Sequence, residues 1–107
     1  MFQLSGFQRD LLYVIAGMDQ PSGQALKSQL EGPYDTEINH GRLYPNLDSL
    51  VEMGLVEKSE LDKRTNQYEL TAKGHDAVVD SLRWTLSKFL TDDERVDEVQ
   101  NLIDELR

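Results

Sequence analysis

The chain has 107 residues, of which 20 are acidic, 11 are basic and none is cysteine, so its formal net charge is −9. This length suits one compact domain, and the lack of cysteine excludes disulfides and thiolate zinc sites. No apolar run approaches the roughly 18 residues that a membrane-spanning helix needs, and the first residues lack the basic start of a secretion signal. We therefore expect a cytoplasmic protein with no membrane partner.

Acidic residues are unevenly distributed along the chain. Residues 75–107 carry nine acids and four bases, whereas residues 1–74 carry eleven acids and seven bases. A nucleic-acid binder normally has a basic footprint, so composition alone argues against DNA binding. An acidic but otherwise ordinary globular sequence is typical of a salt-saturated cytoplasm, because carboxylates keep the surface hydrated. We therefore expect a halophilic source, with solvent cations at high salt as partners.

The first third of the chain predicts two helices. Apolar residues recur every three or four positions from Ser5 to Met18, as on one face of a helix. Ser22 can cap a second, short helix through its hydroxyl, and the apolar stripe of this helix stops at Gly32-Pro33. Residues 32–37 have the composition of a loop.

The middle of the chain predicts a third helix and a hairpin. Asn39 is a natural N-cap for an apolar stripe that Gly54 closes. Beyond Gly54 the apolar residues roughly alternate in residues 55–58 and again in residues 67–70. The polar residues 62–66 between these segments predict the bend of a two-stranded hairpin.

Two further helices complete the chain. Thr71 can cap a long helix that ends near Leu90, and Thr91 can cap a last helix that begins with three acids. The order of elements predicts a mainly α fold with a small β-hairpin wing. We expect a winged helix-turn-helix DNA-binding domain in residues 1–74, followed by C-terminal dimerisation helices in residues 75–107.

The third helix carries side chains that suit DNA recognition. In a helix-turn-helix fold this helix enters the major groove, where arginine can donate two hydrogen bonds to guanine and asparagine can pair with adenine. No acid occurs between Ile38 and Leu47. The predicted DNA contacts of this helix are Asn39, His40, Gly41, Arg42, Tyr44 and Asn46.

Further DNA contacts are expected from the hairpin bend and the second helix. A bend with two cations can reach phosphates or a minor groove, and the second helix crosses the DNA backbone. The predicted contacts are Lys27, Ser28, Lys58, Lys63, Arg64, Thr65 and Asn66. Each of these residues also has a plainer explanation as a helix cap or a solvated turn. Their joint placement on the two elements that a winged helix presents to DNA favours DNA binding.

The C-terminal helices carry an apolar seam. Its residues step by three and four positions, but the seam is too short to hold a coiled coil unaided. The predicted dimerisation residues are Trp84, Phe89, Val96, Val99, Ile103 and Leu106. The alternative is that the last helix packs on the core of its own chain. We favour the dimer, because one small module rarely reaches enough base pairs for useful specificity.

The sequence gives little support for catalysis. His40 and His75 have no cysteine or acidic partner at metal-ligand spacing, and no glycine-rich phosphate loop or nucleophile motif occurs. We therefore expect a protein that is not an enzyme, with no metal site and no cofactor.

Two segments of the chain carry motifs of a known signature. The sequence G-R-L-Y-P-N-L at residues 41–47, followed by L-V-E-M-G-L-V at residues 50–56, resembles the signature G-x-L-Y-P-x-L and L-x-x-x-G-L-[IV] of the PadR-like family of regulators. Residues 68–74, Y-E-L-T-A-K-G, match Y-x-L-T-x-x-G after the wing. The resemblance covers residues 5–90, and the acidic surface resembles the haloarchaeal branch.

The resemblance implies a homodimer that is joined through its C-terminal helices and binds a pseudo-palindromic operator. Members often repress transcription, and some respond to phenolic compounds, drugs or stress. We therefore expect a sequence-specific transcription regulator, a repressor that responds to stress, whose partners are double-stranded DNA and a second copy of itself. The alternative is a winged-helix module that binds a basic protein partner through its acidic face.

Overall fold

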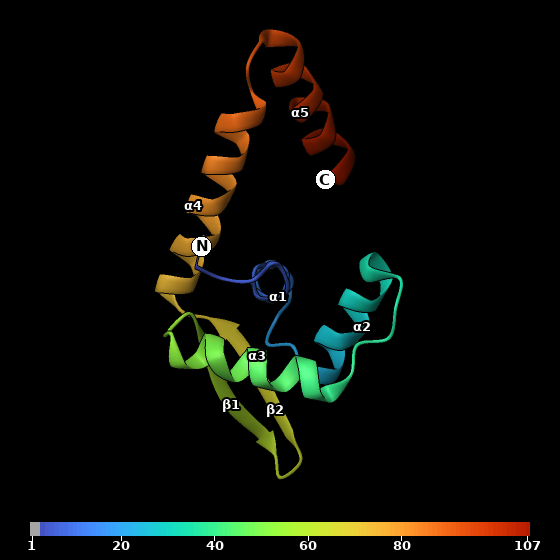
Figure 1. Cartoon of the computed structure of the whole chain (residues 1–107), viewed down its shortest axis with the longest axis vertical. Coiled ribbons are helices and arrows are strands. Elements are labelled where there is room, and N and C mark those ends of the chain that lie inside the picture. The colour runs from blue at the N-terminus through green and yellow to red at the C-terminus, as the bar shows by residue number, and fades with distance from the viewer. Residues whose placement is uncertain (1–2) are drawn as a thin grey trace.

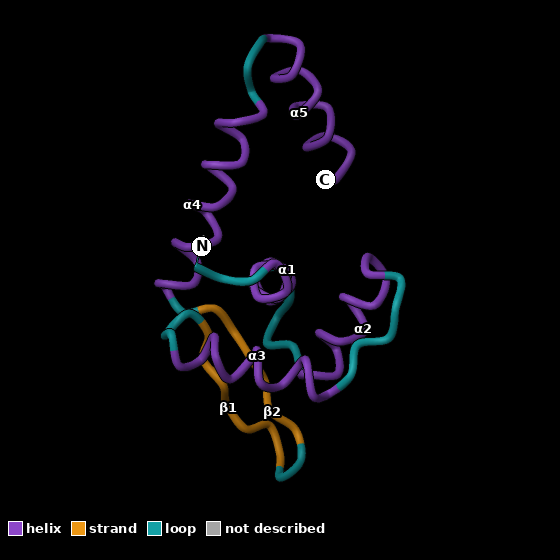
Figure 2. The backbone as a smooth tube through the Cα atoms, in the orientation of Figure 1, coloured by secondary structure: helices purple, strands orange, loops and turns teal. Residues whose placement is uncertain are grey.

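The computed structural model describes residues 3–107 as five helices and one antiparallel hairpin (Figure 1). The elements are α1 (Gly6–Ala16), α2 (Gly23–Tyr34), α3 (His40–Glu52), β1 (Val56–Asp62), β2 (Thr65–Leu70), α4 (Ala72–Phe89) and α5 (Asp93–Leu106). This order confirms the predicted winged helix-turn-helix fold. Helices α2 and α3 form the helix-turn-helix, and the hairpin forms the wing below them (Figure 2).

Each helix begins at a side chain that accepts a backbone N–H of its first turn, where helical N–H groups lack partners. The N-caps are Ser5, Ser22, Asn39, Thr71 and Asp92. The caps predicted for α2, α3 and α4 are thus confirmed. The prediction of Thr91 as the cap of the last helix is wrong by one residue, because the carboxylate of Asp92 accepts the N–H of Arg95 at 2.9 Å.

The end of α2 differs from the prediction. The helix does not stop at Gly32-Pro33 but continues to Tyr34. Proline is tolerated there because it lies in the last turn and removes only one hydrogen bond. Asp35 ends the helix in the left-handed conformation, with φ of 51°, and its N–H donates to the carbonyl of Gly32 at 3.2 Å. The connection to α3 is therefore shorter than expected.

The hairpin strands are longer and its bend is tighter than the sequence suggested. Val56 pairs with Leu70 at the base, and Asp62 pairs with Thr65 at the tip, with an irregularity between Glu60 and Asp62. Only residues 63 and 64 form the turn, so the predicted bend of residues 62–66 is wrong. The strands continue through polar residues near the tip, which are paired by cross-strand hydrogen bonds. An alternating pattern of apolar residues does not predict this part of the hairpin.

Among the described residues, one core of fifteen apolar side chains holds the helix-turn-helix and the wing together. Helix α1 lies at its centre and packs against α2, α3, α4 and β2. The hairpin is also tied to the loop before α2, because the N–H of Tyr68 donates to the carbonyl of Pro21 at 2.9 Å. Within residues 3–107, every buried apolar side chain of this core lies between Leu4 and Val78. We call residues 3–78 the winged body.

The start of α4 is fixed against the end of α3. Gly54 turns the chain with φ of +76°, a conformation that favours glycine. The hydroxyl of Thr71 donates to the carbonyl of Gly54 at 2.6 Å. A Cβ at Gly74 would lie 2.0 Å from the carbonyl oxygen of Leu55, so only glycine allows α4 to lie this close. These contacts set the direction in which α4 leaves the body.

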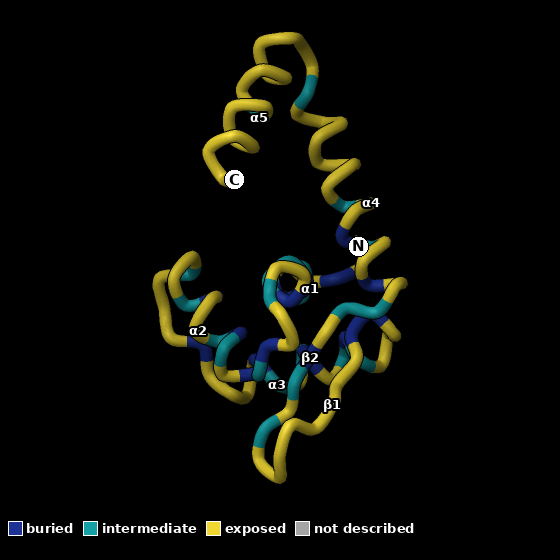
Figure 3. Tube along the Cα trace, turned by 180° about the vertical axis from the view of Figure 1, so that it is seen from behind, coloured by how far each residue is buried: buried dark blue, intermediate teal, exposed yellow. Residues whose placement is uncertain are grey.

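Residues 79–107, which we call the helical arm, extend away from the winged body (Figure 3). Helix α4 crosses the predicted boundary between residues 74 and 75 without interruption. Helix α5 folds back at an angle to α4 and has no buried residue. No helix among residues 3–107 is long and apolar enough to span a membrane.

Candidate nucleic-acid interface

Helix α3 has an inner and an outer side. The inner side buries three leucines in the core, namely Leu43, Leu47 and Leu50. The opposite side, which we call the outer stripe, consists of four exposed residues, namely Gly41, Pro45, Asp48 and Glu52. Pro45, Asp48 and Glu52 are not among the predicted DNA contacts. Helical spacing from the three leucines would have found them.

The beginning of α3 presents predicted contact residues at the surface. Asn39, His40 and Gly41 are exposed. The side-chain oxygen of Asn39 accepts the N–H of Arg42 at 2.8 Å, so this residue acts as the cap. The ring of His40 lies edge-on to that of Tyr44, with centroids 5.4 Å apart. A Cβ at Gly41 would meet only the Asn39 oxygen, at 3.3 Å, so the space outside the helix is open.

Arg42 is exposed but held in place by two aromatic rings. Its guanidinium lies 4.2 Å from the centroid of Phe7 and 5.5 Å from that of Tyr34, within cation–π range. The Tyr34 hydroxyl donates to Asp10 at 2.5 Å. Burial raises the pKa of Tyr34, and the hydrogen bond to Asp10 raises it further. The sequence contained no signal for this aromatic support, because its parts come from three helices.

Tyr44 and Asn46 are turned toward the protein rather than toward solvent. Tyr44 is half-buried over Gly23, where a Cβ would lie 2.6 Å from the Tyr44 hydroxyl oxygen. The Asn46 oxygen accepts from the Gln8 amide at 3.0 Å, and the Asn46 nitrogen donates to the Arg42 carbonyl at 2.7 Å. Their roles as DNA contacts therefore stay predictions, while their packing within the helix-turn-helix is evident.

Lys27 and Ser28 lie on α2, where Ser28 is exposed. Lys27 pairs with Glu31 at 2.9 Å, and Glu31 also accepts the N–H of Ile38 at 2.8 Å. The hydrogen bond from Lys27, and then that from Ile38, holds the pKa of Glu31 below its usual value. The hydrogen bond between Lys27 and Glu31 also raises the pKa of Lys27. This group fastens the turn between α2 and α3 and places Lys27 beside a carboxylate.

The wing brings two cations to its tip. Lys63 and Arg64 form the turn and are exposed, and the N–H of Arg64 donates to the Asp62 carboxylate at 2.8 Å. Of the predicted contacts beside the turn, Asn66 is exposed and Thr65 is half-buried in β2.

Lys58 lies further down the wing and pairs with a carboxylate of the outer stripe. Its ammonium lies 3.5 Å from Asp48. Acids also surround the wing, and Glu57 lies directly opposite Glu69 in the strand pairing.

The predicted dimerisation residues lie on the helical arm at the surface of the single chain. Trp84, Phe89, Val96, Ile103 and Leu106 are exposed, and Val99 is half-buried. Within residues 3–107, α5 does not pack on its own winged body as the alternative expected, because none of its side chains is buried. The arm exposes four more large apolar residues, namely Val79, Leu82, Leu86 and Leu102. The corner between α4 and α5 is held by Arg95, which lies 4.9 Å from the ring of Phe89.

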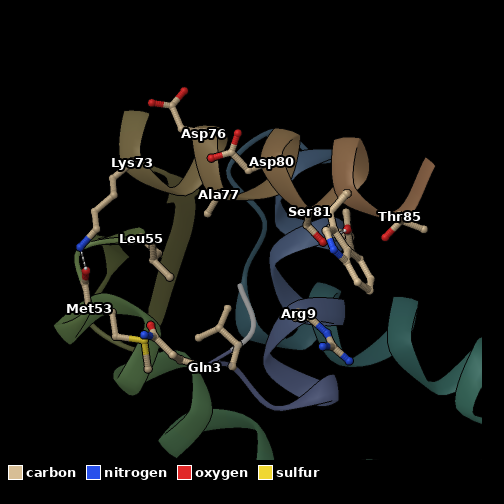
Figure 4. A pocket seen from close by; sticks show the side chains of 13 residues that line it. Gln3, Arg9, Met53, Leu55, Lys73, Asp76, Ala77, Asp80, Ser81 and Thr85 are labelled. Carbon is tan, nitrogen blue, oxygen red and sulfur yellow. Dashed lines mark hydrogen bonds between the residues drawn. The ribbon is translucent and has the colours of Figure 1, made fainter. Parts of the chain in front are cut away.

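A groove of about 850 Å³ lies between α1, the end of α3 and α4 (Figure 4). Its walls combine apolar side chains with Arg9, Asp76 and Asp80, and Lys73 bridges to the carbonyl of Met53 at 2.9 Å. The sequence did not predict this groove, because it depends on the direction of α4. Among residues 3–107, no group of three acidic or histidine side chains is placed to hold a metal ion.

The fold and the exposed third helix define a winged helix-turn-helix protein. The chain belongs to the PadR-like family of transcriptional regulators, whose family model matches residues 11–80. No curated protein matches the chain.

Solved structures extend this comparison. The structure of H. salinarum RosR grown from NaBr shares 56% sequence identity with this chain and has a TM-score of 0.92. The match covers 95% of this chain and 92% of the RosR chain. A complex of RosR with S1 gives 55% identity and a TM-score of 0.94, over 97% of this chain and 92% of that one. These matches confirm the predicted haloarchaeal type of the family.

A more distant match is Bacillus subtilis PadR in complex with operator DNA. It is 20% identical with a TM-score of 0.59, over 72% of this chain and 46% of PadR. At this identity the likeness shows the fold alone.

Proposed function

We propose that this regulator acts in the cytoplasm by binding double-stranded DNA as a homodimer, with α3 in the major groove and the wing on the sugar-phosphate backbone. Family membership supports this function, as does the operator complex of PadR, which shares the fold. The observation that carries the proposal is the placement of cations. In a chain of net charge −9, these two elements expose Arg42, Lys63 and Arg64, which form no ion pair with any residue that the structure describes.

Arg42 is the residue of α3 best suited to contact a base. Stacking on Phe7 orders its side chain and leaves the N–H groups at the edge of the guanidinium available for hydrogen bonds. An ordered arginine loses less conformational entropy when it binds. Its two parallel N–H groups fit O6 and N7 of guanine. Asn39 and His40 lie beside it at the helix start and would add polar contacts.

Lys63 and Arg64 would contact phosphates or a minor groove from the tip of the wing. Three other proposed contacts already have partners within the protein. Lys27, Lys58 and Asn46 are tied to neighbouring side chains or backbone. They would reach DNA only by exchanging these partners. We therefore expect Arg42 and the wing tip to contribute most to affinity.

The acidic surface requires bound cations in the complex. Asp48 and Glu52 extend the outer stripe of α3, and acids surround the wing, so DNA phosphates and protein carboxylates would face each other. Solvent cations held between them would offset this repulsion. An ordinary binder releases cations and loses affinity steeply as salt rises. We expect this protein to lose affinity only weakly with rising KCl, or to gain it.

The homodimer would form through the helical arm. Apolar residues of α4 and α5 are exposed along the arm, and no other element of residues 3–107 covers them. Exposed apolar patches of this kind mark interaction sites. Two copies joined through their arms would present two α3 helices to the two halves of a pseudo-palindromic operator. We propose that the protein represses transcription, because a dimer bound to an operator would block the promoter. The signal to which we propose that it responds is stress.

The function can be tested by selecting duplexes from a random-sequence DNA library in molar KCl. The affinity of the selected duplex and of a scrambled duplex is then measured by fluorescence anisotropy for the natural protein and for Arg42→Ala. Loss of a bidentate base contact should reduce discrimination by about 1–3 kcal/mol. The control is Arg83→Ala, which removes an equal charge from the arm, where Arg83 pairs with Asp80.

The outcomes separate the two candidate functions. Unchanged discrimination by Arg42→Ala would refute its role as a base contact. A library that yields no enriched duplex, at any KCl concentration, would refute DNA binding itself. It would favour the alternative in which the acidic face binds a basic protein.

A further inference from the structure

The first two turns of the outer stripe of α3 carry no polar side chain. Gly41 and Pro45 lie four residues apart and therefore on the same face of the helix. Both are exposed, directly opposite the buried leucines. Neither side chain can donate or accept a hydrogen bond, and the space in front of Gly41 is open. This stretch therefore offers DNA an apolar surface that backbone and bases can approach closely.

Apart from His40 and Arg42, the polar side chains on both flanks of this stretch already make hydrogen bonds within the protein. The Asn39 oxygen caps the helix, and the Asn46 amide is bonded to Gln8 and to the Arg42 carbonyl. The hydroxyl of Ser49 donates to the carbonyl of Pro45 at 3.0 Å. The middle of α3 thus has few hydrogen-bonding groups free to read the edge of a base.

We infer that Pro45 is a specificity-determining residue whose ring contacts the 5-methyl group of a thymine in the operator. This inference rests on the proposed DNA binding by α3. The thymine methyl is the apolar feature of the major groove, and apolar side chains read it by contact. A proline ring suits this contact because it is rigid and already exposed, so little entropy is lost. Gly41, one turn earlier, lets the helix approach the groove closely enough.

The contact has a definite expected size. Burial of one methyl group contributes about 0.8 kcal/mol, which corresponds to about fourfold in affinity. The inference therefore predicts a thymine in each half-site whose methyl group strengthens binding about fourfold. It also predicts that this preference depends on Pro45 and not on Arg42, which would read a neighbouring base.

The test uses the duplex selected from the random library in molar KCl. Each thymine is replaced singly by deoxyuridine, which lacks only the methyl group, and affinity is measured by anisotropy. The variants are Pro45→Ala, which removes the ring and restores a backbone N–H in a strong helix former, and Pro45→Val, which restores apolar carbons. Circular dichroism confirms that each variant is folded.

We expect one thymine per half-site at which deoxyuridine weakens binding about fourfold for the natural protein. The effect should disappear in Pro45→Ala and return in Pro45→Val. Either of two results would overturn the inference: no thymine is sensitive, or the sensitivity persists unchanged in Pro45→Ala. Both results leave DNA binding intact, whereas failure to select any duplex refutes the proposed function instead.

Discussion

The winged body and the helical arm use their apolar residues in opposite ways. In the part of the chain that the structure describes, all fifteen buried apolar residues of the core lie in the body, where α1 is surrounded by other elements. Of the eleven large apolar residues that are exposed among residues 3–107, nine lie in the arm. The body thus has its own hydrophobic core, whereas the arm lacks one within a single chain. The difference supports the proposed homodimer, in which a second copy would cover the apolar residues of the arm.

The largest expected effect comes from the core of the body. Leu11 on α1 is fully buried, so Leu11→Ala leaves a cavity and should lower the free energy of unfolding by about 2–5 kcal/mol. The same substitution at Leu61, which is 60% exposed on the wing, should change it by less than about 0.5 kcal/mol. Urea unfolding measures both. Equal losses at the two positions would contradict the assignment of the core.

The next effect concerns the arm. Ile103→Asp places a charge in the proposed interface, where an unpaired buried charge costs several kcal/mol, so the dimer should dissociate at least about 100-fold more readily. Asn101→Asp adds the same charge to an exposed position on the same helix and should leave the dimer intact. Sedimentation over a range of protein concentrations measures the dissociation. If both variants behave alike, the seam on α5 is not the interface.

A smaller effect is expected from acid. The pKa of Glu31 is lowered by its bonds from Lys27 and Ile38, so its contribution to stability is complete above the unfolded pKa of about 4.3. The contribution is lost as the pH falls through the lower pKa of the folded state. Urea unfolding of the natural protein and of Glu31→Gln should therefore differ near neutral pH and converge in acid. A difference that stays constant with pH would contradict this role.

The smallest effect comes from the charges of the wing. Glu57 and Glu69 lie directly opposite each other, and like charges in this position are destabilising. Glu57→Lys should raise the free energy of unfolding by about 0.2–1 kcal/mol at low salt. The gain should shrink in molar KCl, where charges are screened. A gain that is independent of salt would point to packing instead of charge.

The sequence predicted much of the body because its signals are local. Ser22, Asn39 and Thr71 precede apolar stripes, and a side-chain cap acts only on the next turn. The predicted end of α2 and the predicted length of the hairpin strands were wrong. A proline in the last turn of a helix and a ladder of polar residues leave no local signal in the sequence. The support of Arg42 by Phe7 and Tyr34 depends on three helices meeting, which no spacing in one helix reveals.

In the proposed complex, two copies joined by their arms place two α3 helices on one operator. Hydroxyl-radical footprinting of the natural protein on the selected duplex, in molar KCl, shows whether both helices are bound. We predict two protected patches related by symmetry, with centres about one helical turn, roughly 10 base pairs, or a multiple of it apart. A single protected patch, or uniform protection along the duplex, would contradict the proposed dimeric complex.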